Sequence, residues 1–371
     1  MKAENRICVV SGIYPPETGG PAKFVETFMR WGQQNNIQID CVSLTDGRGQ
    51  TFCESSSEIS LITRDQSLLR RYLVTTFLIT QKMFRNHLVL ANGLFLEVLF
   101  AYLITRKPYI CKVPGDIVWE RARNNKLTNL DVNQFQKSKL GIRYSIFRFL
   151  FSQSLKKSTK VIVPSSHLES LCLGWGVKPE KIHVIYNSVD TDRFIPVPEK
   201  STFDVIVLNR LVAWKHVDEV IDVCHRLNLS LLVVGEGPER SNLEAAASKF
   251  SNITFVGEKS QEEIPIIINQ ARCYVLNSSF EATSYSLLEA RSAGLFCIAN
   301  AGTGSEEVIK HMVDGVLCGS NGVSLSDALK LFKKDPNFVQ KASDLGRKDA
   351  LLRFSLKENY LKIYKLVEEL R

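Results

Sequence analysis

The chain has 371 residues, of which 44% are hydrophobic and 23% are charged, and its formal net charge is +8. At about 150 residues per domain this length predicts two domains, and the composition excludes a disordered or fibrous protein. The best candidate for a membrane span, residues 88–104, is interrupted by polar residues and falls short of the roughly 20 apolar residues that a spanning helix needs. The start of the chain, "MKAENRICVVSG", carries three charges and then a short predicted strand, so we expect no signal peptide.

The cysteines indicate the redox compartment of the protein, and the basic residues show where its positive charge lies. Nine cysteines, an odd number, are scattered from Cys8 to Cys318 with no C-x-x-C pair. Such a pattern is typical of free thiols in a reducing compartment, so we expect a cytoplasmic protein. The positive charge is concentrated in residues 101–160, where basic side chains far outnumber acidic ones.

Short β-branched runs alternate with stretches long enough for helices. In the first half of the chain, strands are expected at 6–12, 37–44, 58–63, 87–92, 109–113 and 160–165. After residue 200 the alternation restarts, with strands expected at 203–209, 229–235, 252–257, 272–278 and 295–300. Apolar strands separated by helices predict parallel sheets covered on both faces, so we expect two doubly wound, Rossmann-like α/β domains.

The expected domains cover residues 1–186 and 187–353, with a join near 187–200, where two prolines and mixed charge interrupt the pattern. Residues 354–371 predict a closing helix that packs back on the first domain. Its apolar positions 361, 364 and 367 are spaced for one helical face.

Loops that follow the strands are the candidate binding sites, because doubly wound domains bind ligands at the carboxyl ends of their strands. The first such loop contains Gly19 and Gly20, which allow close backbone approach just before a helix. A tight turn without a ligand would use glycines in the same way. The loop is neither a G-x-G-x-x-G fingerprint nor a P-loop.

A second loop, in "LNRLVAWKHVDEVI", carries two cations. Arg210 and Lys215 leave the end of one predicted strand together, where a guanidinium fork and an ammonium could neutralise a diphosphate. The alternative is ordinary solvated surface charge. Their position at a strand terminus favours a function.

A third loop, in "SSFEATSYSLLEARSAG", carries two glutamates eight residues apart. A helix is expected to begin near Ser284, which places Glu281 in the loop and Glu289 in the helix. The amides of Tyr285, Ser286 and Leu287 would then face an anion or a sugar oxygen, while the carboxylates would accept hydrogen bonds from sugar hydroxyls. The structural alternatives are a capping box between Ser286 and Glu289, and plain loop charge for Glu281.

Several motifs in order carry a resemblance to a known family. They are "TGGPAKFV", "VIYNSVDTDRF", "LNRLVAWKHVDEVI", "VVGEGPE", "EATSYSLLEARSAG" and "AGTGSEEVIKHMVDGVL". Together they resemble the retaining glycosyltransferases of family 4, which have the GT-B fold of two Rossmann-like domains facing a cleft. The E-x7-E pattern from Glu281 to Glu289 is the most diagnostic of them.

The resemblance implies a role for each matching position. Arg210 and Lys215 would hold the donor diphosphate and stabilise the leaving nucleotide. Glu281 would contact the donor sugar and Glu289 the nucleotide ribose. Backbone amides from Ser284 to Leu287 would meet sugar and phosphate oxygens. Gly19 and Gly20 would close over the diphosphate from the other domain, and the loop after Val256 would bracket the base.

The chain departs from the family pattern in its first half. The strand that often ends in a functional histidine here has the sequence "CKVPGDIVWE", without a histidine. Asp116 or Glu120 would have to replace it, or its function is missing. Asp190 and Asp192 resemble a metal-binding D-x-D, but they fit the interdomain motif of the family, so we expect no metal and no cofactor.

The basic segment 137–160 interleaves Lys and Arg with aromatic and aliphatic residues. It predicts either a helix lying on an anionic membrane surface, where a lipid-linked acceptor would be met, or a core helix with snorkelling basic ends. Nucleic acid is not an expected partner, because no binding motif accompanies the charge.

The favoured hypothesis is a metal-independent hexosyltransferase at the inner face of the cytoplasmic membrane. It would move a sugar from a UDP- or GDP-linked donor to a glycan or lipid-linked acceptor in bacterial surface polysaccharide synthesis: O-antigen, capsule or exopolysaccharide. The alternative is a non-catalytic GT-B-fold binding module, suggested by the altered "CKVPGD" stretch. A nicotinamide oxidoreductase is suggested only by the parallel sheets and lacks the G-x-G-x-x-G fingerprint.

Overall fold

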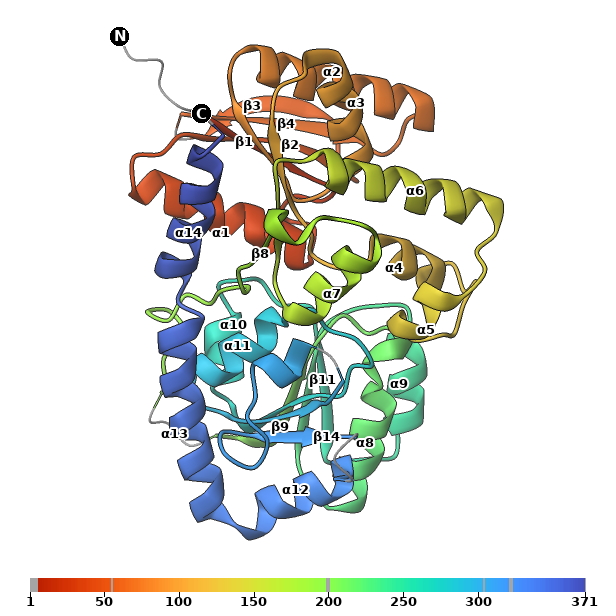
Figure 1. The fold of residues 1–371 in the computed structure, drawn as a ribbon. Coiled ribbons are helices and arrows are strands. Elements are labelled where there is room, and N and C mark those ends of the chain that lie inside the picture. The colour runs from red at the N-terminus through yellow and green to blue at the C-terminus, as the bar shows by residue number, and fades with distance from the viewer. Residues whose placement is uncertain (1–5, 55, 198–200, 303, 320–322, 371) are drawn as a thin grey trace. The chain divides into compact units, whose positions relative to one another are not determined.

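The computed structural model describes residues 6–54, 56–197, 201–302, 304–319 and 323–370. The chain divides into two compact units, the first formed by residues 1–185 and 360–371 and the second by residues 186–359. Of the predicted join at 187–200, residues 198–200 lie outside the described part. Figure 1 shows the elements of both units.

The first unit is built on a sheet in which eight described strands are paired. In spatial order they are β3 (Gln50–Glu54), β4 (Ser57–Thr63), β2 (Ile39–Thr45), β1 (Ile7–Ser11), β5 (Leu88–Ala91), β6 (Tyr109–Lys112), β7 (Lys160–Val163) and β8 (Ile182–Val184). The strands pair in parallel, except that β3 runs antiparallel to β4 at one edge. β1 and β2 are buried along their whole length, because helices cover both faces of a parallel sheet.

Most helices of the first unit connect these strands, and the last one comes from the C-terminal end of the chain. They are α1 (Gly20–Gln34), α2 (Leu68–Phe84), α3 (Phe95–Thr105), α4 (Ile117–Asn124), α5 (Val132–Lys137), α6 (Ile142–Lys157), α7 (Ser166–Gly174), the 3₁₀ turn η1 (Pro179–Lys181) and α14 (Leu356–Glu368). α3 packs against both α2 and α6. The described residues include no helix with the length and apolar character needed to cross a bilayer.

Helix α14 begins in the second unit and ends in the first, where it packs on α1. The Tyr360 ring lies edge-on to Phe28, with the two ring centroids 5.3 Å apart, and also contacts Phe24 and Trp31. Residues 360, 363 and 367 are buried. Of the predicted face of 361, 364 and 367, positions 364 and 367 are confirmed, because the Tyr364 ring lies 5.9 Å from that of Trp31 and Val367 is buried. Position 361 was wrong, because Leu361 is exposed and the neighbouring Tyr360 packs in its place.

The second unit is built on a sheet of six described strands, all paired in parallel. In spatial order they are β11 (Ile253–Gly257), β10 (Leu231–Val234), β9 (Phe203–Leu208), β12 (Ala271–Leu276), β13 (Phe296–Asn300) and β14 (Val316–Cys318). The other elements are η2 (Ala213–Lys215), α8 (Val217–Arg226), α9 (Arg240–Ala247), α10 (Ile264–Ile268), α11 (Tyr285–Ser292), η3 (Gly304–Glu307), α12 (Leu325–Lys334) and α13 (Pro336–Arg353).

Two hydrophobic clusters sandwich the sheet of the second unit. One lies between the sheet and helices α8, α9 and α12, and the other between the sheet and helices α10 and α11. The expectation of doubly wound α/β units is confirmed. All the predicted strands are present, and β3, β8 and β14 were not predicted.

Candidate functional site

The carboxyl edge of the second sheet contains a topological switch point between β9 and β12. From β9 the chain first builds outward through β10 and β11, and then crosses over to build β12, β13 and β14 on the other side. The loops after β9 and β12 therefore leave the sheet in opposite directions, which is where open α/β sheets bind ligands. Arg210 and Lys215 follow β9, and Glu281 follows β12. The structure thus brings together residues that the sequence assigned to separate loops.

Lys215 and Glu281 form an ion pair across this switch point. The Lys215 ammonium contacts Oε1 of Glu281, and each side chain is 15% exposed. The backbone holds the same two loops together, because the Ser279 amide donates to the carbonyl oxygen of Trp214 at 2.9 Å. The Arg210 side chain is exposed to solvent. A cation and a carboxylate are therefore held side by side at an accessible position.

The loop that carries Glu281 is fixed from both sides by backbone contacts. The Gly304 amide donates to the Glu281 carbonyl oxygen at 2.8 Å, and Nδ2 of Asn187 donates to the Thr283 carbonyl oxygen at 2.8 Å. A Cβ atom at Gly304 would collide with the backbone of Ala282. Only glycine allows this close approach, so Gly304 is a positioning residue for the Glu281 loop.

Helix α11 starts where the sequence predicted, but its cap differs from the expected alternative. Ser284 is the N-cap, and its hydroxyl oxygen accepts from the Leu287 amide at 3.4 Å. The hydroxyl of Ser286 instead contacts the Tyr274 hydroxyl at 2.7 Å and the Ser284 hydroxyl at 3.0 Å. A capping box between Ser286 and Glu289 is therefore wrong, because the capping position lies two residues earlier.

Glu289 lies inside α11 and is 2% exposed. A buried carboxylate requires polar partners, so this residue is not ordinary surface charge. The family resemblance assigns Glu289 a contact with the nucleotide ribose. That contact stays a prediction.

The loop after β10 lies against the loop after β9. A Cβ atom at Gly235 or Gly237 would collide with the carbonyl oxygen of Asn209 or of Leu211, respectively. The Leu211 amide donates to the Glu236 carbonyl oxygen at 2.7 Å. These contacts fix the backbone path that leads to Arg210.

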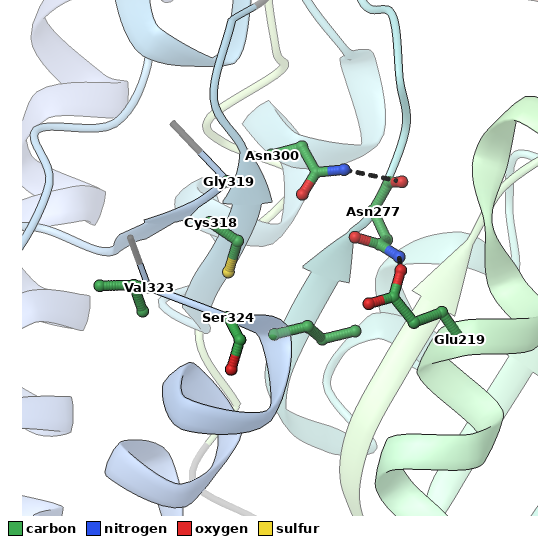
Figure 2. Close-up of a pocket in the computed structure, with 8 residues that line it drawn as sticks. Glu219, Asn277, Asn300, Cys318, Gly319, Val323 and Ser324 are labelled. Atoms are coloured by element: carbon green, nitrogen blue, oxygen red, sulfur yellow. Dashed lines mark hydrogen bonds between the residues drawn. The ribbon is translucent and has the colours of Figure 1, made fainter. Parts of the chain in front are cut away.

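A cavity of about 310 Å³ opens at the same sheet edge (Figure 2). None of the predicted site residues lines it; its walls include Glu219, Asn277, Asn300 and Cys318. Asn277 Nδ2 donates to Glu219 Oε2 at 2.8 Å, and Asn300 Nδ2 donates to the Asn277 carbonyl oxygen at 3.0 Å. Asn277 follows β12 and Asn300 is the last residue of β13, so these contacts support the base of the Glu281 loop. The sequence signal was weak, because a lone Asn after a strand is common in turns.

In the first unit, Gly19 and Gly20 mark the start of α1. Gly19 is the N-cap with φ of 147°, a conformation that favours glycine, and α1 begins at Gly20. The loop before them is held by Arg64, which the sequence analysis missed. Its guanidinium donates to Glu17 at 2.8 Å, to Asp46 at 2.7 Å and to the Gly12 carbonyl oxygen at 2.5 Å.

Asp116, the proposed replacement for a histidine, is the N-cap of α4. Its Oδ1 accepts from the amides of Val118 at 2.9 Å and Trp119 at 3.0 Å, and its Oδ2 accepts from Gln136 at 2.8 Å. The side chain is buried, and burial raises its pKa, although these hydrogen bonds partly counter the effect. Capping explains the two amide contacts, and a role with sugar or acceptor stays a prediction.

The D-x-D sequence has other partners in the structure. Asp192 pairs with Lys357 at 2.9 Å, and Asp190 accepts the Asp192 amide at 3.2 Å. Over the part of the chain that the structure describes, no group of three or more His, Cys, Asp or Glu side chains is arranged to hold a metal ion.

Two family models match the chain in succession. The model described as Glycosyltransferase Family 4 matches residues 18–193, and the model described as Glycosyl transferases group 1 matches residues 188–349. They meet near the boundary between the two units.

Curated relatives match part of the chain at low identity. The gpi3 subunit of the Schizosaccharomyces pombe phosphatidylinositol N-acetylglucosaminyltransferase is 27% identical over 148 residues, covering 37% of this chain and 32% of that protein. The Escherichia coli K12 lipopolysaccharide 1,6-galactosyltransferase is 29% identical over 201 residues, covering 49% of this chain and 56% of that protein. The matched region spans well under half the length of the phosphatidylinositol N-acetylglucosaminyltransferase relatives.

Solved structures match the whole fold. A Thermosynechococcus elongatus sucrose-phosphate synthase superposes with a TM-score of 0.81 at 16% identity, covering 99% of each chain. Anabaena HepE in complex with UDP-glucose has a TM-score of 0.77 at 17% identity, covering 98% of this chain and 99% of that one. At these low identities the comparison shows the fold alone. Both units of the chain have the same fold as these proteins.

Proposed function

Since the chain belongs to the family 4-type glycosyltransferases with the GT-B fold, we propose that it transfers a sugar from a nucleotide-sugar donor to a glycan or lipid-linked acceptor, with retention at the anomeric carbon. The observation that carries the proposal is the ion pair of Lys215 with Glu281 at the switch point between β9 and β12, with Arg210 exposed on the same loop as Lys215. Two cations suit a diphosphate, and a carboxylate beside them suits sugar hydroxyls.

In this proposal each residue of the site contacts a different part of the nucleotide-sugar donor. Arg210 and Lys215 hold the diphosphate and stabilise its charge as the bond to the sugar breaks. Glu281 accepts hydrogen bonds from the donor sugar. The first turn of α11, from Ser284 to Leu287, offers amides to sugar and phosphate oxygens. Glu289 meets the ribose, and Gly19 and Gly20 keep their proposed contact with the diphosphate. No metal ion is required, because the side-chain cations take its place.

The donor and acceptor classes are supported by the names of similar proteins. Anabaena HepE binds UDP-glucose in its crystal, which makes a UDP-linked donor the first to test and a GDP-linked donor the second. Relatives named for lipopolysaccharide and O-antigen sugar transfer support a hexosyltransferase of bacterial surface polysaccharide synthesis. A relative named for transfer to a diphosphoundecaprenol-linked sugar supports a lipid-linked acceptor.

We place the protein in the cytoplasm, at the inner face of the membrane. All nine cysteines are described and all are free thiols, which suits a reducing compartment. A lipid-linked acceptor would bring the protein to a bilayer, where residues 137–160 would contribute a peripheral contact.

Ligand-induced thermal stabilisation tests the donor site. UDP, GDP, dTDP, CDP and NAD are each added at high concentration to the wild type, to Lys215→Ala and to Lys330→Ala. Lys330 is the matched control, because it pairs with Asp327 on the exposed side of α12. A ligand at about 100 times its Kd should add roughly 2.7 kcal/mol to the stability.

We expect one nucleoside diphosphate to stabilise the wild type and the control, and to stabilise Lys215→Ala by at most about half as much. The corresponding nucleotide sugars are then assayed for transfer to lipid-linked and glycan acceptors. A folded protein that responds to no nucleoside diphosphate would favour the non-catalytic binding module. A response to NAD alone would favour an oxidoreductase.

A further inference from the structure

Helix α2 exposes a stripe of large apolar side chains. Leu69, Leu73 and Phe77 are 72%, 63% and 59% exposed, and they recur every four residues, so they lie on one helical face. Leu68 and Phe84 extend the exposed apolar surface to the two ends of the helix. An isolated exposed leucine is ordinary, but a continuous stripe of this size on one helix is a feature of interaction surfaces.

Two further helices of the first unit expose apolar stripes of the same kind. On α6 they are Ile142, Ile146 and Phe149, and on α3 they are Phe100, Leu103 and Ile104. Because α3 packs against α2 on one side and α6 on the other, the three helices lie next to one another (Figure 1). We call the outward surface of α2, α3 and α6 the apolar face.

The exposed charges carried by the three helices of the apolar face all have one sign. Helices α2 and α6 contain no Asp or Glu, and the single acid of α3, Glu97, is buried. The exposed charges on the three helices and at their C-terminal ends are those of Arg70, Arg85, Arg106, Lys107, Arg143 and Lys157. Asp65, which precedes α2, is an exposed acid at the edge of this surface, and the six cations outnumber it. An apolar surface with such an excess of cations is complementary to a surface that is apolar inside and anionic outside.

We propose that the apolar face docks on the surface of an anionic lipid bilayer. The leucine, isoleucine and phenylalanine side chains enter the boundary between headgroups and acyl chains, and the arginines and lysines meet the anionic headgroups. This deepens the proposed membrane contact. It adds α2 and α3 to the segment 137–160, and it rests on the membrane part of the proposed function and not on sugar transfer.

The charge of the apolar face argues against a second copy of the chain as its occupant. A two-fold contact would bring this face against itself and place arginines opposite arginines. Juxtaposed like charges oppose association, whereas anionic headgroups attract the same residues. An anionic bilayer offers acyl chains to the apolar side chains and anionic headgroups to the cations.

Vesicle sedimentation tests the proposal with the full chain and without any nucleotide or acceptor. The vesicles are phosphatidylcholine alone, or phosphatidylcholine with about a third of anionic phosphatidylglycerol. The proteins are the wild type, Leu69→Ser/Leu73→Ser on α2, Ile142→Ser/Ile146→Ser on α6, and Ile266→Ser/Leu352→Ser as a control. Ile266 and Leu352 are 68% and 72% exposed and lie in the second unit, so the control removes a matched amount of exposed apolar surface.

We expect the wild type and the control to bind the anionic vesicles, with binding that weakens as salt is raised. Each of the other two variants should bind at least about tenfold more weakly. Circular dichroism and melting temperature should be unchanged, because the replaced side chains are exposed. Lys215→Ala should bind vesicles like the wild type, which separates this proposal from the donor site.

Three results would overturn the proposal. Wild-type protein that stays in solution with both kinds of vesicle has no membrane face. Unchanged binding by the α2 variant would restrict the contact to α6. Self-association of the wild type in light scattering, abolished by Leu69→Ser/Leu73→Ser, would identify a second copy as the occupant.

Discussion

The Lys215 ammonium and the Glu281 carboxylate form an ion pair between loops that leave β9 and β12. A bound diphosphate would compete with Glu281 for Lys215. We expect Lys215→Ala to weaken nucleoside diphosphate binding by about ten- to a hundredfold, the value of one charge-assisted contact. Glu281→Gln should bind the same nucleotide at least as tightly as the wild type, because Lys215 is released.

Glu281→Gln should nevertheless slow sugar transfer by about a hundredfold, since the proposed contact with the donor sugar is lost. Calorimetric titration of the nucleotide and a transfer assay check both halves. If Glu281→Gln weakens nucleotide binding as much as Lys215→Ala does, the ion pair only supports the loop.

Asp116 offers a test of capping against catalysis. Asp116→Ala should destabilise the protein by about 1–3 kcal/mol, because two amides of α4 lose their buried acceptor. Asp116→Asn can still cap and should lose less. Asp131→Ala is the control, since Asp131 caps α5 at an exposed position and should cost less than Asp116→Ala.

The measurements for Asp116 are urea unfolding and the transfer rate. A capping role predicts that Asp116→Asn keeps most of its activity. A large loss of activity in a stably folded Asp116→Asn would instead support the role that the missing histidine suggested.

Glu97 predicts that the protein loses stability as the pH rises from 4.5 to 7. Burial in α3 raises the pKa of this carboxyl from 4.5 to about 7. The folded protein therefore holds a proton that the unfolded chain has released, so stability is full below pH 4.5 and falls as the pH rises to 7. Glu97→Gln should be more stable than the wild type at pH 8, by up to about 3 kcal/mol, and equal to it near pH 4. Glu180→Gln, at an exposed site, should show no such trend in urea unfolding.

Asp40 predicts the opposite trend in acid. Burial alone would raise its pKa, but hydrogen bonds from His87 at 2.9 Å and Lys82 at 2.7 Å outweigh burial and lower the pKa to about 2. About 2 kcal/mol of stability is then present above pH 4 and is lost as the pH falls toward 2.

Unfolding of Asp40→Asn across this pH range checks the expectation. Its deficit relative to the wild type should shrink between pH 4 and pH 2. Glu26→Gln removes the partly exposed pair with Arg30 and should change little. A constant deficit for Asp40→Asn would assign the effect to packing rather than to charge.

The strands that the sequence predicted and those that it missed differ in burial and length. β1 and β2 are buried on both faces, so each appears as an unbroken apolar run. β3 is an edge strand with mostly exposed residues, and β8 and β14 have three residues each. Short or exposed strands depend on pairing with a neighbour, which has no local signature.

The position of the candidate residues at strand ends was predictable, but their contacts were not. Arg210, Lys215 and Glu281 could be assigned to loops at strand ends, because strand boundaries and parallel pairing follow from sequence patterns. The contact between Lys215 and Glu281 depends on the paths of the two loops. Those paths are fixed by long-range contacts, such as the hydrogen bond from the Gly304 amide to the Glu281 carbonyl oxygen. The cap of α11 was mistaken because Ser284 and Ser286 have equal capping propensity and only the backbone distinguishes them.

The packing of α14 on α1 has a consequence for the order in which the protein is made. Tyr360 covers Phe28 and Trp31, yet it follows the whole second unit in the chain. During synthesis the aromatic surface of α1 therefore stays uncovered while the ribosome adds some 170 further residues. At usual elongation rates this takes about 10–30 s. Nascent chains of this protein thus have a defined interval in which a chaperone would find an apolar target.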